Sequence, residues 1–131
     1  MIYGNNILGI KNIEKLYTVC SDFTWNNVVA IEKVNYYMEY NEYYDMVSNL
    51  ILLFIIELPD KKYKLLVKFC VINNLNMNNF GGCYNQIMGL EVINQRNCGW
   101  ENEYTYIVRD YENGSIEFYC ESIEILEIIP I

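Results

Sequence analysis

The side chains that most often carry acid–base or metal chemistry are scarce in this chain of 131 residues. It contains no histidine, which is the commonest general base and metal ligand near neutral pH. A Ser-His or Cys-His nucleophile pair therefore cannot form within it. The remaining candidates for chemistry are the cysteines, one glycine pair and the carboxylates.

The five cysteines are widely spaced, odd in number and without a Cys-x-x-Cys pair. Cys83 and Cys98 both stand in glycine-containing stretches, but a zinc site would need a second pair of ligands. Cys20, Cys70 and Cys120 fall in regular segments and resemble small buried hydrophobes. We therefore expect reduced structural thiols, no metal and a cytoplasmic location.

The glycine pair Gly81-Gly82 lacks the flanking residues of a phosphate-binding loop and predicts only a turn with positive φ. Glu57 is the one carboxylate closely flanked by apolar residues, as a glycosidase acid with a raised pKa would be. It precedes the turn at Pro59, which favours an exposed strand end instead. We therefore predict no catalytic residue and no cofactor.

The negative charge is concentrated at the end of the chain. The net charge is −8, and residues 101–131 hold eight acids against the single base Arg109. Such a field repels nucleic acid and anionic membranes and attracts a basic protein partner. The alternative is a solvated face that keeps the protein soluble. For Arg109 the alternatives are an anionic ligand or a pairing with a neighbouring glutamate.

An alternating segment near this end places acids around a tyrosine. Side chains two apart in a strand point the same way, so Glu117, Tyr119 and Glu121 are predicted to share the outer face. The residues between them, Ile116, Phe118 and Cys120, are predicted to face the core. The candidate partner-binding residues are Glu117, Tyr119, Glu121, Arg109 and Trp100, the last as an aromatic interface anchor.

The elements that would position these residues begin with a helix over residues 10–20, where apolar residues recur with a helical period. A period of two follows over residues 28–40, with Val34, Tyr36, Met38 and Tyr40 on its apolar face. Residues 47–58 predict a central strand that is covered on both faces, and residues 63–69 predict its hairpin partner after the turn at Pro59.

Further strands are predicted over residues 86–94, around residues 104–109 and from residue 116 onward. Asn113-Gly114 predicts a two-residue type I′ hairpin between the last two. A change of inward phase at Glu121-Ser122 predicts a bulge or a strand break there. The fold class is therefore mainly β, with residues 1–131 forming one domain. We expect an antiparallel curved sheet, small sandwich or half-barrel with one short N-terminal helix.

No segment predicts a membrane span or a signal peptide. The longest apolar run, residues 50–56, is far shorter than the roughly 20 residues that a spanning helix needs. The N-terminus has no basic region followed by a long apolar stretch.

From about residue 25 to residue 125, the layout resembles small bacterial β-rich immunity proteins of polymorphic toxin systems. The segments that carry the resemblance are residues 65–69, 71–77, 79–82, 87–92 and 116–120. Trp25-Asn26-Asn27 stands where the group commonly has an aromatic residue followed by His-Asp. No role for that pair is therefore carried over.

The resemblance implies stoichiometric binding of a protein partner, and the acidic end of the chain favours a basic one such as a nuclease toxin domain. The alternative is a structural or small-ligand-binding β module, whose site would be an apolar pocket. A non-enzymatic binding protein is the function that we expect. The sequence does not determine the oligomeric state.

Overall fold

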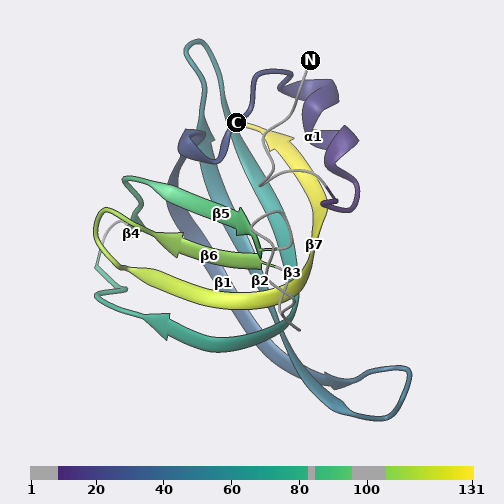
Figure 1. The fold of residues 1–131 in the computed structure, drawn as a ribbon. Coiled ribbons are helices and arrows are strands. Elements are labelled where there is room, and N and C mark those ends of the chain that lie inside the picture. Colours follow the sequence, from purple (N-terminus) through teal and green to yellow (C-terminus); the bar gives the residue numbers. More distant parts are fainter. Residues whose placement is uncertain (1–8, 83–84, 96–105) are drawn as a thin grey trace.

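The computed structural model describes residues 9–82, 85–95 and 106–131, and its main feature is one curled antiparallel sheet (Figure 1). The elements in chain order are α1 (Ile13–Val19), a 3-10 turn (Trp25–Asn27), β1 (Val28–Tyr40), β2 (Met46–Glu57), β3 (Lys62–Met77), β4 (Asn85–Gln86), β5 (Leu90–Asn94), β6 (Tyr106–Asp110) and β7 (Ile116–Pro130). The strand order is β4-β1-β2-β3-β7-β6-β5. The predicted fold class is confirmed, and the shape is the half-barrel.

Aromatic rings fill the concave side of the half-barrel. They follow one another edge to face, with ring centroids 6.3 Å apart for Trp25 and Phe54, 6.3 Å for Phe54 and Phe69, and 4.9 Å for Phe69 and Phe118. Phe54, Phe69 and Phe118 come from β2, β3 and β7, so the row of rings crosses three neighbouring strands. Edge-to-face contact adds to the stabilisation from burying these large side chains.

The predicted change in which alternate residues of β7 face the core is present. Ile116, Phe118 and Cys120 are buried, and so is Ile123. However, β7 does not break, and its register with β3 is the same on both sides of this point. The irregularity is shared with β3, where Val71 has a φ of 55°. The two strands therefore change face together, which bends the sheet and keeps apolar side chains on its concave side.

The predicted helix is confirmed but is shorter than residues 10–20. Lys11 pairs with β7 instead, because its N–H donates to the carbonyl of Ile123 and its carbonyl accepts from Ile125. The helix begins only after Asn12, which has a φ of 63°. Leu16 is buried in the core, as the helical period predicts.

The continuous strand predicted over residues 86–94 is wrong. It is split into β4 and β5, and Ile87 is buried while Met88 is exposed. The chain passes close to Tyr111 at Gly89, where an added Cβ would lie 2.6 Å from the tyrosine ring. A side chain does not fit there, which explains why a glycine interrupts the expected alternation.

The β6–β7 hairpin is confirmed, but its two-residue type I′ turn is wrong. Five residues separate the strands, and of the Asn113-Gly114 pair only Gly114 has a positive φ. The reason is Asp110, a buried carboxylate that accepts the backbone N–H groups of Glu112 and Asn113 and the hydroxyl of Ser115. These bonds favour a wider loop over the tight turn.

Replacing Asp110 by alanine should destabilise the protein by about 2 kcal/mol or more, because the loop N–H groups lose their acceptor. Urea unfolding followed by circular dichroism measures this change. The control is Asn113→Ala in the same loop, whose exposed side chain should contribute within about 0.5 kcal/mol. Equal stability of the two variants would contradict the role given to Asp110.

Candidate functional site

The acid–tyrosine segment of β7 lies on the outer side of the sheet, as predicted. Glu117 and Glu121 are exposed and Tyr119 is half-buried, whereas the residues between them face the core. Glu117 is opposite Arg109 of β6, and Tyr119 is opposite Ile107. Arg109 and Ile107 are in turn opposite Glu91 and Ile93 of β5. We call the outward side chains of β5, β6 and β7 in this region the outer patch. It consists of Glu91, Ile93, Ile107, Arg109, Glu117, Tyr119 and Glu121.

Arg109 is held by one of its two acidic neighbours. Its Nε donates to Glu91 of β5 at 2.8 Å, although its register also places it beside Glu117. Both partners are partly exposed, so the ion pair contributes little stability. Of the two interpretations of Arg109, pairing with a neighbouring glutamate is therefore the one found.

Glu117 and Glu121 have no ion pair with any residue that the structure describes. Their charges point outward, one on each side of Tyr119 along the strand. An aromatic ring between unneutralised carboxylates suits contact with a basic surface. Trp100, the fifth predicted site residue, lies outside the described residues.

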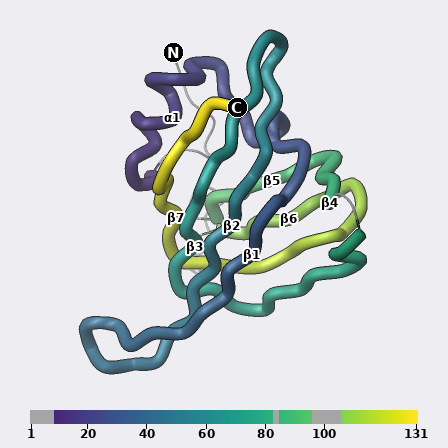
Figure 2. Tube along the Cα trace, turned by 180° about the vertical axis from the view of Figure 1, so that it is seen from behind, coloured from purple at the N-terminus to yellow at the C-terminus, as the bar shows by residue number. Residues whose placement is uncertain are grey.

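A second exposed surface was missed at the sequence level. Of the apolar face predicted for residues 28–40, only the first residues, Val28 and Ala30, are buried in the core. Val34, Tyr36, Met38 and Tyr40 are 38%, 52%, 57% and 66% exposed. Met38 and Tyr40 belong to the end of the β1–β2 hairpin, residues 37–49, which we call the arm and which projects from the body of the sheet (Figure 2).

The arm is exposed because β3 does not follow β2 along its whole length. The β2–β3 pairing runs only from Leu50 opposite Phe69 to Glu57 opposite Lys62. The sequence held one indication of this difference in length. The first strand was predicted with 13 residues, whereas the regular alternation after the Pro59 turn covered only residues 63–69. Where the β1–β2 hairpin extends beyond β3, one of its two faces stays uncovered.

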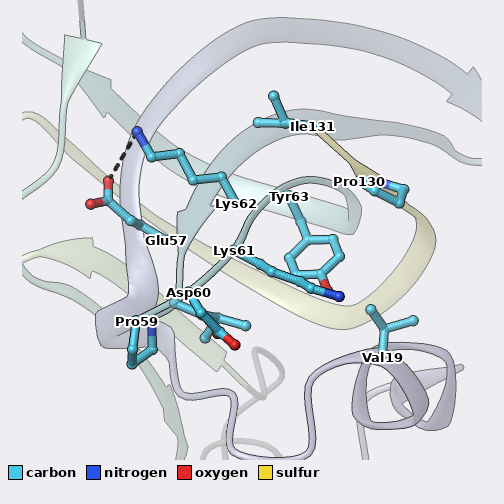
Figure 3. A pocket seen from close by; sticks show the side chains of 10 residues that line it. Val19, Glu57, Pro59, Asp60, Lys61, Lys62, Tyr63, Pro130 and Ile131 are labelled. Carbon is cyan, nitrogen blue, oxygen red and sulfur yellow. Dashed lines mark ion pairs between the residues drawn. The ribbon is translucent and has the colours of Figure 1, made fainter.

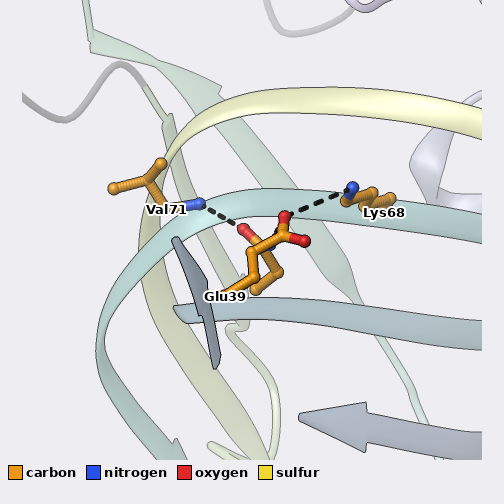
Figure 4. Close-up of polar contacts among 4 residues, drawn as sticks. Glu39, Lys68 and Val71 are labelled. Atoms are coloured by element: carbon orange, nitrogen blue, oxygen red, sulfur yellow. Dashed lines mark hydrogen bonds and ion pairs between the residues drawn. The ribbon is translucent and has the colours of Figure 1, made fainter. Parts of the chain in front are cut away.

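Asn49 fills the point where β3 leaves β2. It is buried, its Oδ1 accepts the N–H of Val71 at 3.0 Å, and its Nδ2 donates to Glu39. Glu39 in turn lies 3.9 Å from the ammonium of Lys68 (Figure 4). The side chain of Asn49 thus replaces the strand pairing that β2 loses here and ties the base of the arm to β3.

Lys68 is the positively charged residue beside Glu39 at the base of the arm. Burial favours the neutral form of its ammonium, but the hydrogen bond with Tyr37, together with the nearby Cys70 and Glu39, outweighs it, so the pKa of Lys68 is raised. Lys68 therefore stays protonated at neutral pH and partly neutralises Glu39.

An open pocket of about 710 Å³ lies at one end of the half-barrel (Figure 3). Val19 of α1, the turn after β2 and the chain end at Pro130 and Ile131 form its walls. Lys62 lies 4.0 Å from Glu57 at its edge, with both side chains more than half exposed. Glu57 is therefore the exposed strand end that was predicted. The mixed lining and open shape suit solvent better than an apolar ligand.

The described cysteines are free thiols. Burial raises the pKa of both Cys20 and Cys120, most strongly for Cys120, so the unreactive protonated form is favoured. Cys83 and Cys98 lie outside the described residues. Within the described residues, no three cysteine or acidic side chains gather as metal ligands. No helix in the same part of the chain is long and apolar enough to cross a membrane.

We found no match to this chain among protein-family models, curated proteins or solved structures.

Replacing Asn49 by alanine should cost about 1–3 kcal/mol of stability, because the N–H of half-buried Val71 loses its acceptor. Chemical denaturation measures this loss. Hydrogen exchange should also show faster exchange at Val71 than in the wild type. Asn35→Ala, an exposed substitution on β1, is the matched control and should leave both measurements unchanged. Unchanged exchange at Val71 in Asn49→Ala would contradict the tie between arm and β3.

Cys20 and Cys120 should resist alkylation by iodoacetamide at pH 7.5 in the folded protein, because burial blocks access and raises their pKa values. Mass spectrometry of timed samples locates the modified residues, and both should react quickly in denaturant. Cys70, which is half-buried, is the internal comparison and should react before Cys120. Equal rates for Cys70 and Cys120 in the folded state would contradict this order.

Proposed function

We propose that this protein is a non-enzymatic binding protein that neutralises a basic protein partner by stoichiometric contact, in the manner of an immunity protein. The observation that carries the proposal is the outer patch, in which Glu117 and Glu121 present carboxylates on either side of Tyr119 that have no ion pair among the described residues. The resemblance to bacterial β-rich immunity proteins points the same way.

The chemistry of the patch explains how it would recognise such a partner. Unneutralised carboxylates speed the encounter with a basic surface through long-range attraction. Half-buried Tyr119, Ile93 and Ile107 offer apolar contact area between the charges. These side chains stand on paired strands and lose little freedom on binding, which favours affinity. A basic toxin domain, such as a nuclease, is a partner with this chemistry.

The proposal is tested with the product of a neighbouring gene that encodes a basic, growth-inhibiting protein. The wild-type protein should bind it one to one and restore growth when the two are co-expressed. The variant Glu117→Lys with Glu121→Lys should fold normally, since both residues are exposed. Its association rate should fall by about tenfold or more, with a weaker dependence on salt.

The matched control is Glu14→Lys with Asp60→Lys, which makes the same change in net charge at exposed positions on α1 and in the β2–β3 turn. This control should keep more of the wild-type association rate than the patch variant does. If the two double variants lose the same amount, only net charge matters and the outer patch is not the contact surface. Unchanged binding by the patch variant would also contradict the proposal.

A further inference from the structure

Among the residues that the structure describes, one edge of β1 is unpaired along most of its length. On one side β1 pairs with β2 as far as Tyr40, and on the other β4 pairs with it only at Ala30 and Ile31. In the part of the chain that the structure describes, residues 32–40 therefore have no strand on this second side. We call these nine residues the free edge. Their unpaired N–H and C=O groups can accept another strand.

The free edge lacks most of the features that prevent strand addition. It contains no proline, and its register with β2 has no irregularity between Lys33 and Tyr40. Lys33 is its only lysine. Its exposed side chains Val34, Tyr36 and Met38 lie on the face that Leu50 and Leu52 of β2 bury in the core, because opposite residues share a face. A long, regular edge with one apolar face favours association.

We propose that a second copy of this chain pairs antiparallel with the free edge, around a twofold axis at Tyr36. The two ends of the edge determine this register. Within the described residues β4 pairs with β1 up to Ile31 and the turn begins after Tyr40, so the midpoint of residues 32–40 is Tyr36. A twofold axis there lets each copy use the whole free edge of the other.

In this register the opposing side chains are complementary. Lys33 lies opposite Glu39 of the second copy, and this pair occurs twice. Val34 lies opposite Met38, also twice, and Tyr36 lies opposite its own copy. Shifting the axis by one or two residues separates Lys33 from Glu39 and leaves part of the edge unpaired. The only lysine of the edge thus meets a carboxylate in the one register that uses every free residue.

The charges within a single copy leave Lys33 available for this pairing. Among the described residues Lys33 has no ion pair. Glu39 contacts Asn49 and Lys68 through its Oε1, and its side chain is about half exposed, which leaves Oε2 for a further cation. The same pairing would join the two exposed apolar rows into one continuous face. This inference uses β1 alone and is independent of the partner-binding proposal, which concerns β5, β6 and β7.

Sedimentation equilibrium on the full chain tests the dimer. The wild type should have twice the chain mass of 15.6 kDa at micromolar concentration. Tyr36→Lys places two ammonium groups opposite each other and should give a monomer. Tyr43→Lys is the matched control, because Tyr43 is an exposed tyrosine in the turn outside the paired residues, and it should stay dimeric. Circular dichroism confirms that both variants fold.

Charge exchange tests the register. Lys33→Glu and Glu39→Lys should each weaken self-association, because each sets like charges opposite each other. An equimolar mixture of the two variants should form a heterodimer, since both cross-strand pairs are then opposite in charge. A monomeric wild type up to millimolar concentration would overturn the proposal and leave the edge to a foreign strand. A dimer that survives Tyr36→Lys, or a mixture that fails to associate, would also overturn it.

The two proposals fail in different ways. Tyr36→Lys leaves the outer patch unchanged, so loss of the dimer with intact partner binding would support both. The patch variant Glu117→Lys with Glu121→Lys leaves the free edge unchanged and should still dimerise.

Discussion

The separation of β3 from β2 is the constraint on which the rest of this structure depends. Up to Leu50 and Phe69 the two strands are paired, and beyond that point β3 turns away with β7. The side chain of Asn49 bonds the N–H of Val71 where the strand pairing stops. A buried N–H without an acceptor would oppose the turn, so this one amide makes the separation compatible with a packed interior.

The same separation produces both the half-barrel and the arm. Because β3 and β7 change face together near Val71, the later residues of β3 and the earlier residues of β7 curl over the concave side and keep apolar side chains within it. The rings of Phe54, Phe69 and Phe118 fill the space that this curl encloses. β1 and β2 continue past this point without β3, so the end of their hairpin has no third strand beside it among the described residues (Figures 1 and 2).

Two surfaces of different chemistry follow from this arrangement. The outer patch is acidic, lies on three paired strands and includes the half-buried Tyr119. The free edge of β1 is apolar on one face, and among the described residues no strand pairs with its backbone groups on the side away from β2. Side-chain charge governs recognition at the first, whereas backbone pairing with a matched register governs it at the second. The two surfaces can therefore act separately.

The sequence by itself determined the class of fold and the face of β7 that carries Glu117, Tyr119 and Glu121. Both follow from local alternation, because a strand sends neighbouring side chains to opposite faces whatever it packs against. Only the tertiary structure decided what covers each face. Met38 and Tyr40 alternate as core residues do, yet they are exposed because β3 departs from β2 before reaching them. The wide β6–β7 loop likewise depends on the buried carboxylate of Asp110. The first outcome arises from residues distant in the chain, and the second arises from side-chain hydrogen bonds within the loop. Local periodicity encodes neither.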